Sequence, residues 1–401
     1  EKPAFAFGVS GLYALVRGVE DGKKGWERVS MALLSLAVLS KTGAVLFLAP
    51  AAALLIHQGR GWEGAMGFCG WALLPALGVA LWQDLAGLGG MGPTLGVLRR
   101  SYGLTSWPYK LRAFFAFAGA CGVVTAAWPF WVLRRRPGLL LAAAAAGAFL
   151  LLPAFDLRAV ALTDRAFGFV AAAAAMAGFL ALGLPETRRS PGWILWAAWI
   201  CAAAGLQLFL YWGVLARIVL FLTPPFVFLL AGRLEESLKP RVLAVVYAAS
   251  LALTLAVGLG SAWVDLRYAD SQKRFASEVA GPAVAAGKRV FFAGHWGLQY
   301  YMEKAGAIPL DESKGGYEEM KKGDFFALSR VNSNNSLLGE PSLAQGHVIR
   351  HDREIQVRSS VPLRLISGWT GQAGFYADSW GFLPYSFSTE PVEEFALGEH
   401  Q

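Results

Sequence analysis

The order of apolar and polar residues divides the chain near residue 264. Before this point long apolar runs follow one another with short polar joints between them, and after it no run is long enough to cross a bilayer. A membrane-spanning helix needs about 20 mostly apolar residues, which segments such as 111–133, 166–184 and 242–263 supply. The pattern predicts an α-helical multi-pass membrane body in residues 1–263 and a water-facing domain in residues 264–401.

The apolar runs predict about ten membrane segments. Several are shorter than a full span, and the two that meet at Lys41 fit either a pair of tilted or broken helices or one kinked helix. The predicted segments are residues 3–17, 29–40, 43–57, 65–83, 111–133, 138–154, 166–184, 193–215, 217–232 and 242–263.

The tail after residue 263 has the pattern of a small mixed α/β domain. Residues 288–294 are typical of a buried strand that ends in a turn. Residues 296–304 have helical spacing and are followed by Gly306, a residue that commonly ends helices. A helix at residues 272–280 and short strands at 324–329 and 347–349 complete the predicted domain.

The formal net charge of +8 is distributed unevenly. From residue 265 onward the chain holds 14 Lys and Arg against 17 Asp and Glu, so the tail carries −3 and the membrane body +11. Basic residues between spans usually set membrane topology, and the chain has no basic stripe interleaved with aromatic residues. The distribution therefore argues against a nucleic-acid partner.

The basic joints also predict the orientation. With ten segments, the joints on one side hold most of the Lys and Arg, and the three arginines at residues 134–136 are the clearest marker. By the positive-inside rule this side is cytoplasmic, so the C-terminal domain is expected on the external face.

Two cations at external helix ends are candidates for contact with an anionic ligand. Lys41 interrupts an apolar stretch, and it fits either a lysine that reaches the interface or a phosphate-binding cation. Arg217 leads into an apolar run that ends in two prolines, and its guanidinium could bind phosphate through two hydrogen bonds or serve as an interfacial anchor.

One external joint gathers two acids and two bases. Asp156, Arg158, Asp164 and Arg165 lie within ten residues of one another. A solvated, self-paired loop and a polar site above the membrane body both fit this composition.

In the tail, residues 294–301 place polar and aromatic side chains directly after a predicted strand. His295, Trp296, Gln299 and Tyr300 could present hydrogen-bonding groups and ring faces to a sugar or a phosphate. Packing of the same residues into the domain core fits equally well.

Four short stretches resemble bacterial membrane glycosyltransferases of the GT-C superfamily, in glycosyltransferase family 39, the group related to protein O-mannosyltransferases and aminoarabinose transferase. The stretches are residues 39–43 (Leu-Ser-Lys-Thr-Gly) with a later proline, residues 217–225, residues 294–306, and residues 373–376 with 380–381. The resemblance covers most of the chain in layout and only these stretches in residues.

This resemblance implies an enzyme of the bacterial plasma (inner) membrane. Such enzymes move a sugar from a polyprenyl-phosphate carrier to a lipid, glycan or protein acceptor at the external face. Lys41, Arg158, Arg165 and Arg217 are then expected at the donor phosphate, while Asp156, Asp164 and the residues of the 294–301 turn are substrate-site candidates.

The same resemblance places the catalytic acid in a first external loop that has no counterpart here. We therefore expect that acid to precede Glu1, so that the chain shown is catalytically incomplete. A divalent metal stays open as a cofactor, although the sequence shows no clear ligand set.

Two other functions stay open. A transporter or flippase also has many apolar spans with scattered charge, and a non-catalytic membrane subunit could use the tail to bind a partner. Transporter sites usually lie near mid-membrane between repeats. Here the polar clusters lie at external helix ends and no repeat is visible, which favours the transferase.

Overall fold

The computed structural model describes residues 2–86, 107–122, 127–151, 161–188, 192–211, 213–310, 319–332, 349–367 and 371–400. It divides into two compact units. The helical unit contains Glu1–Ala154, Phe167–Leu251 and Ala377–Ser379. The α/β unit contains Phe155–Ala166, Ala252–Tyr376 and Trp380–Gln401. The main change of unit thus falls between residues 251 and 252, upstream of the boundary predicted after residue 263.

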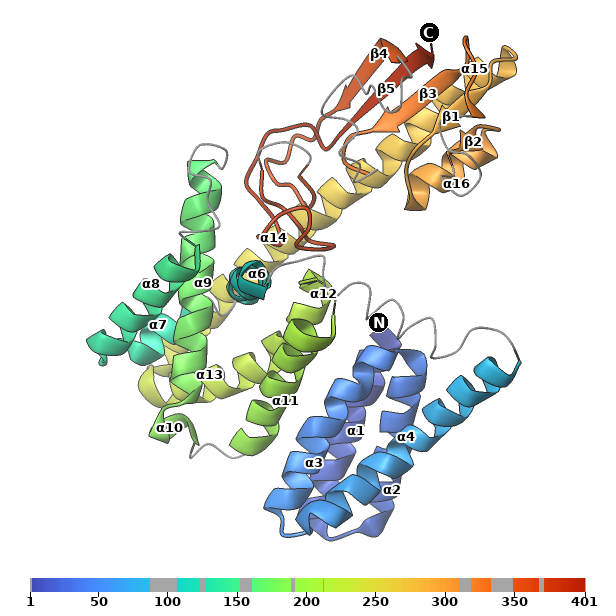
Figure 1. Ribbon diagram of the computed structural model, residues 1–401. Helices are drawn as coiled ribbons and strands as arrows, with labels where there is room; N and C mark the ends of the chain where they lie inside the picture. The colour runs from blue at the N-terminus through green and yellow to red at the C-terminus, as the bar shows by residue number, and fades with distance from the viewer. Residues whose placement is uncertain are drawn as a thin grey trace. The chain divides into compact units, whose positions relative to one another are not determined.

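In the described residues before the sheet begins, the regular elements are helices, joined by short connections (Figure 1). Its helices are α1 (Lys2–Asp21), α2 (Lys24–Ser40), η1 (Thr42–Phe47), α3 (Leu48–His57), α4 (Gly61–Leu85), α6 (Trp107–Cys121), α7 (Trp128–Leu133), α8 (Pro137–Leu151), α9 (Leu162–Leu182), α10 (Pro185–Arg188), α11 (Trp193–Gly205), η3 (Leu206–Leu210), α12 (Ala216–Val219), η4 (Leu220–Leu222), α13 (Thr223–Ser237) and α14 (Pro240–Phe275).

Among the residues that the structure describes, four helical segments are long and apolar enough to cross a membrane: Gly61–Gln83, Leu162–Leu182, Ala216–Ser237 and Pro240–Ala285. Shorter apolar helices lie at Gly43–His57, Pro137–Leu151 and Trp193–Phe209. The expectation of a helical body with membrane spans is therefore supported, whereas the count of ten spans is not. One predicted span, residues 111–133, contains two separate helices, α6 and α7.

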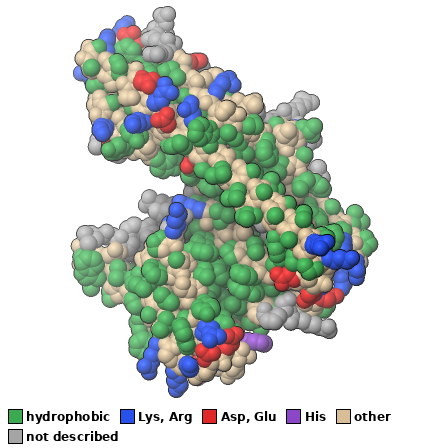
Figure 2. Space-filling model, turned by 180° about the vertical axis from the view of Figure 1, so that it is seen from behind, with side chains coloured by type: hydrophobic (Ala, Val, Ile, Leu, Met, Phe, Trp, Pro, Cys, Tyr) green, Lys and Arg blue, Asp and Glu red, His purple; other side chains and the backbone are tan. Residues whose placement is uncertain are grey.

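Large apolar side chains lie exposed on these helices. Trp71 on α4 is 68% exposed and Phe149 on α8 is 75% exposed. Figure 2 shows hydrophobic side chains over wide areas of the surface, with Lys, Arg, Asp and Glu gathered into separate groups. Soluble proteins rarely expose apolar patches of this extent, so the surface fits contact with lipid.

Small residues let three helices of the helical unit approach closely. A Cβ atom placed on Gly119 of α6 would lie 1.7 Å from the carbonyl oxygen of Ala171 on α9, and one on Gly147 of α8 would lie 2.9 Å from the nitrogen of Ala173. The alanines at residues 171–175 are all buried. The alanine-rich sequence of α9 is thus explained by backbone packing, which is how membrane helices commonly associate.

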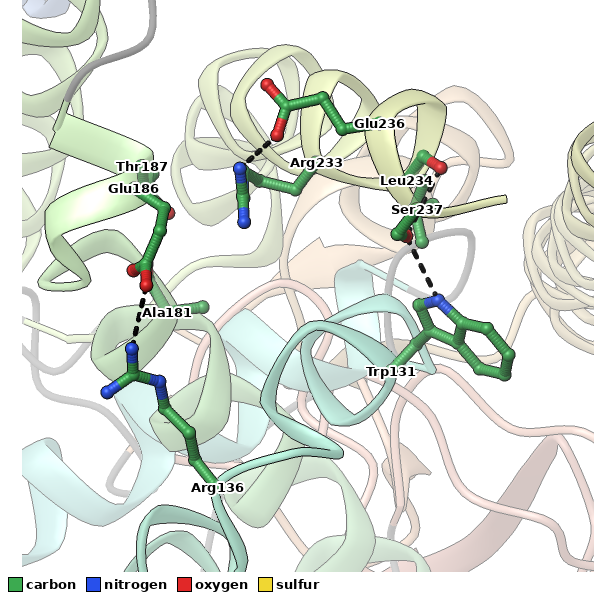
Figure 3. Close-up of polar contacts among 9 residues, drawn as sticks. All are labelled: Trp131, Arg136, Ala181, Glu186, Thr187, Arg233, Leu234, Glu236 and Ser237. Atoms are coloured by element: carbon green, nitrogen blue, oxygen red, sulfur yellow. Dashed lines mark hydrogen bonds and ion pairs between the residues drawn. The ribbon is translucent and has the colours of Figure 1, made fainter. Parts of the chain in front are cut away.

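Polar side chains cluster at one end of the helical unit (Figure 3). Arg136, just before α8, pairs with Glu186 of α10 at 2.8 Å, and Arg233 pairs with the glutamate three residues later on α13. The indole N–H of Trp131 donates to the hydroxyl of Ser237 at 3.2 Å. Acids on neighbouring helix ends therefore offset part of the basic charge that the sequence places in these joints.

The α/β unit is built on a five-stranded mixed sheet (Figure 1). Its strands are β1 (Val290–Phe292), β2 (Ile308–Pro309), β3 (Phe325–Ser329), β4 (Ile349–Val357) and β5 (Glu393–His400), in the order β2-β1-β3-β5-β4. β1 runs parallel to β2 and β3, and β5 runs antiparallel to β3 and β4. Helices η5 (Ala276–Ala280), α15 (Gly281–Ala285) and α16 (Trp296–Lys304) accompany the sheet.

Both faces of this sheet are covered by apolar residues. On one face the end of α14 packs against the sheet, and the rings of Phe275 and Phe395 stack at 4.3 Å between centroids. On the other face Phe291, Phe326 and Met320 form a second cluster. A strand that is buried on both faces does not need alternating apolar and polar residues. This explains why the sequence of β1, Val-Phe-Phe, is apolar at every position.

Several elements of the tail were predicted correctly. The strand β1, the helix α16 and the strand β3 lie where the sequence pattern predicts them, and residues 272–280 are helical. The strand predicted at 347–349 overlaps β4 (Ile349–Val357) at Ile349 alone, and residues 347–348 lie outside the described residues. β2 and β5, which lies between β3 and β4, were missed.

Candidate functional site

The turn between β1 and α16 carries a strained tryptophan. Trp296 has a backbone φ of +54°, and it is the one residue other than glycine with positive φ among those described. A left-handed conformation costs an L-residue about 1–2 kcal/mol, so the surrounding structure must hold it in place. The side chain is nevertheless 57% exposed.

A buried polar network fixes this turn. The backbone N–H of His295 donates to Oδ1 of Asn332 at 2.7 Å, and the N–H of Asn332 donates to Glu393 at 3.1 Å. Glu393 also accepts from the hydroxyl of Ser329 at 2.7 Å and from the N–H of Val331 at 2.8 Å. Burial raises the pKa of Glu393 to about 7, although these hydrogen bonds oppose the shift.

Aromatic rings surround the strained residue. The Trp296 ring lies 6.4 Å from Tyr376 and 5.9 Å from Trp380, measured between centroids. Tyr300, one helical turn along α16, is 59% exposed. We refer to Trp296, Tyr300, Tyr376 and Trp380 as the aromatic patch.

The other predicted residues of this turn lie near the patch. His295 is exposed, and the side chain of Gln299 is exposed and donates to Glu303 at 2.9 Å. His295, Gln299 and Tyr300 are therefore exposed to solvent.

A second candidate site lies in the helical unit around Asp378. The hydroxyl of Tyr109 donates to the carbonyl oxygen of Asp378 at 2.8 Å, and the N–H of Asp378 donates to the carbonyl of Val214 at 2.9 Å. A Cβ on Gly213 would lie 2.5 Å from Oδ1 of Asp378, so only glycine fits there. We call Tyr109, Lys110, Gly213, Val214 and Asp378 the Asp378 cluster.

The carboxyl group of Asp378 is isolated in this cluster. The residue is 0% exposed, and neither carboxylate oxygen has a hydrogen-bond partner among the residues that the structure describes. Burial raises the pKa of Asp378 to about 6, while the backbone of Val214 and the charge of Lys110 oppose the rise. A buried carboxylate without donors is costly, which makes it a candidate for ligand contact.

The loop beside Asp378 is held by polar contacts. The ammonium group of Lys110 donates to the carbonyl of Tyr211, and the buried side chain of Gln207 donates to the carbonyl of Gly213. The N–H of Leu215 donates back to Gln207 at 3.4 Å. The apolar segment predicted at residues 193–215 thus stops being helical after Leu210, and its extended end supplies the wall of the cluster.

Two of the predicted phosphate ligands lie in the helical unit. Lys41 adopts an extended conformation between α2 and η1, which confirms a break between helices at this position. The nearby Gly43 lies against the hydroxyl of Tyr211, which would be 3.4 Å from an added Cβ. Arg217 lies on the short helix α12 and is exposed.

The structure describes only part of the segment that holds two aspartates and two arginines, residues 156–165. Asp156 and Arg158 lie outside the described residues. Asp164 and Arg165 belong to the α/β unit, where Asp164 is 1% exposed and accepts the N–H of Gln372 at 3.1 Å. Asp164 therefore connects the start of α9 to the tail. Because it is buried, Asp164 does not belong to a solvated loop, which was one of the two possibilities left by the sequence.

The sequence did not single out Asp378. It lies between residues 373–376 and 380–381, and both stretches contribute to the glycosyltransferase resemblance. This position was the one feature of the sequence that could have marked Asp378 as a site residue. Tyr109 and Lys110 directly precede the predicted segment 111–133, and the sequence analysis assigned them no role. Among the described residues, no three His, Cys, Asp or Glu side chains lie together as a metal site.

No protein-family model matches the chain, and no curated protein or solved structure does so either. The class that the structure itself defines is a helical protein with four candidate membrane spans and an α/β unit built on a five-stranded sheet.

Proposed function

We propose that the protein is a membrane glycosyltransferase that moves a sugar from a polyprenyl-phosphate carrier to an acceptor hydroxyl. The observation that carries this proposal is the Asp378 cluster, in which a buried carboxyl group without hydrogen-bond donors lies near a lysine and a tyrosine. The acceptor would be a lipid, a glycan or a protein at the external face of a bacterial plasma membrane.

Asp378 is suited to accept a proton. A general base works best when its pKa lies near the operating pH, and a pKa of about 6 leaves this carboxyl group mostly ionised at neutral pH. An acceptor hydroxyl would supply the hydrogen-bond donor that the two carboxylate oxygens lack.

The transfer then proceeds as a displacement at the anomeric carbon. The acceptor oxygen forms a bond to this carbon while its proton passes to Asp378. The bond between the carbon and the donor phosphate oxygen breaks, and the phosphate leaves with the electron pair. Lys110, Lys41 and Arg217 are the cations of the helical unit that we assign to the leaving phosphate, where fixed positive charge stabilises the transition state.

Within the α/β unit, taken by itself, we assign the aromatic patch to binding of a sugar ring. The exposed rings of Trp296 and Tyr300 offer apolar faces beside polar groups such as the Gln299 amide, a combination that suits a sugar ring with C–H faces and hydroxyl edges.

The test is turnover by the full-length protein in proteoliposomes with a radiolabelled polyprenyl-phosphate sugar. We expect release of polyprenyl phosphate and labelling of the acceptor, with a rate that rises as pH increases through about 6, because Asp378 must be ionised. Asp378→Asn should lower the rate by about 100-fold or more and abolish this pH dependence.

Glu236→Gln, which removes an exposed carboxylate of the same helical unit, serves as the matched control and should keep full activity. Movement of intact sugar lipid across the bilayer without transfer would reject the proposal in favour of a flippase. Normal turnover by Asp378→Asn would reject Asp378 as the base.

A further inference from the structure

A cleft in the α/β unit lies outside both candidate sites. It has a volume of about 230 Å³ and runs between the last turns of α14 and the strands β4 and β5. Its floor is apolar and includes Phe275, Val279, Ile355, Val357 and Phe395. None of these residues belongs to the aromatic patch or to the Asp378 cluster.

Three arginines line this cleft. Arg274 forms two hydrogen bonds with Glu278, at 3.0 and 3.3 Å, so its charge is neutralised locally. Arg358 donates only to neutral oxygens, of Gln356 at 2.9 Å and of the Thr389 backbone at 3.4 Å. These contacts leave the charge of Arg358 without a carboxylate among the residues that the structure describes.

Arg267 is the third arginine, and it has no hydrogen bond or ion pair with the part of the chain described. It is half-buried at the edge of the cleft. The remaining acid, Asp270, lies one helical turn away and also lines the cleft. Three guanidinium groups against two carboxylates leave the cleft with a net positive charge.

The position of Arg267 along α14 indicates the source of the ligand. The apolar run of this helix ends at Trp263, so Arg267 follows it by four residues, or about 6 Å of helix. The headgroup layer on each side of the hydrocarbon core is about 5–8 Å thick. Arg267 therefore lies at the level of the lipid phosphates if residues 242–263 span the membrane.

We infer that this cleft binds the phosphate group of an anionic membrane phospholipid. Arg267 and Arg358 bind the phosphate oxygens, because a guanidinium group can donate two parallel hydrogen bonds to phosphate. The inference does not depend on the proposed transferase activity.

The experiment uses the full-length protein in nanodiscs of phosphatidylcholine with a fraction of phosphatidylglycerol, and it measures retained lipid by native mass spectrometry. We expect preferential retention of phosphatidylglycerol. Arg267→Gln should weaken retention by about tenfold or more, since the charge and its paired hydrogen bonds to the phosphate are lost, and Arg358→Gln should do the same. Asp270→Asn should strengthen retention, because it removes a negative charge from the cleft.

Lys273→Gln is the matched control, because Lys273 is an exposed cation on the same helix that does not line the cleft. An equal loss in Lys273→Gln and Arg267→Gln would show general charge attraction and overturn the inference. Stronger retention in Arg267→Gln with weaker retention in Asp270→Asn would indicate a cationic ligand and also overturn it.

A competition experiment with a soluble anion distinguishes binding of the lipid from binding of free phosphate. Inorganic phosphate is titrated against the bound lipid, and we expect it to compete only at concentrations far above those of the lipid. If inorganic phosphate bound as tightly as the lipid, the cleft would be a site for a free anion and the assignment to a membrane lipid would be wrong. Thermal unfolding of each variant shows whether the substitution left the fold intact.

Discussion

Trp296 combines a strained backbone with a largely exposed side chain. Nothing in its own conformation favours this arrangement, and the hydrogen bond from His295 to Asn332 maintains it from outside. Strain of this kind persists where the surrounding structure over-determines it, and it is common at binding sites. The left-handed backbone of Trp296 therefore lowers the stability of the turn, whereas it keeps the indole ring exposed to solvent.

This strain can be measured with a pair of variants. Trp296→Gly and Trp296→Val both remove the indole, but only glycine adopts positive φ without a steric penalty. We expect Trp296→Gly to unfold at the higher temperature, by an amount equivalent to about 1 kcal/mol. Thermal unfolding in detergent followed by circular dichroism provides the comparison.

Gln299 supplies the control for that pair. It lies in the regular helix α16, where valine is tolerated better than glycine, so Gln299→Val should be slightly more stable than Gln299→Gly. The same order at both positions would contradict the strain assigned to Trp296.

The residues of the two candidate sites differ in how far sequence predicts them. Trp296 and Tyr300 could be predicted because a buried strand, a glycine turn and a helix follow one another within a few residues. Asp378 could not, because its partner Tyr109 lies 269 residues away and burial of a single aspartate leaves no local pattern. Tertiary contact alone determines that site.

Among the elements, α6 and α9 show how backbone contact limits a helix sequence. The site of a Cβ at Gly119 is occupied by the carbonyl oxygen of Ala171, and backbone cannot rotate away as a side chain can. The contact requires glycine at this position even though glycine lowers helix propensity.

We therefore expect Gly119→Ala to destabilise the helical unit by about 1–3 kcal/mol, because the two helices must separate to admit one methyl group. Gly67→Ala on α4 is the control, since nothing lies within 4 Å of a Cβ at that position, and it should be neutral or slightly stabilising. Unfolding midpoints of the purified proteins decide between the two. A Gly119→Ala protein as stable as Gly67→Ala would mean that α6 and α9 are not in contact as described.

Helices and strands were predictable to different degrees. Apolar runs predicted helical segments well, because membrane helices must be apolar along their length. β5 was missed because it begins with Glu393 and Glu394, and two consecutive carboxylates indicate a solvated surface. Hydrogen bonds from Ser329, Val331 and Asn332 allow Glu393 to be buried, and no sequence pattern reveals donors that lie more than 60 residues away in the chain, at the end of β3 and in the turn after it.

For the whole molecule, the distribution of charged residues predicts how the protein is oriented in the membrane, and the fold does not test this prediction. The arginines at residues 134–136 lie at helix ends together with Glu186, and the α/β unit contains most of the acidic tail. The positive-inside rule assigns the first group to the cytoplasm and the tail to the external face.

Cysteine labelling tests this assignment in intact cells. The native Cys69, Cys121 and Cys201, which form no disulfide, are first replaced by alanine. A membrane-impermeant thiol reagent should then label Ser360→Cys in the tail and fail to label Arg135→Cys until the membrane is permeabilised. The opposite pattern would reverse the orientation and remove the external active site on which the transferase depends.

Burial of Glu393 has a thermodynamic consequence for the α/β unit as a whole. The pKa of this carboxyl group is about 7 in the folded protein and about 4.5 in an unfolded chain, so folding takes up protons from solution between these two values. Through Glu393, the free energy of unfolding is therefore greatest below about pH 4.5 and decreases as pH rises through 7. Most carboxylates give the opposite trend, and this unit couples its folding to the proton concentration around it.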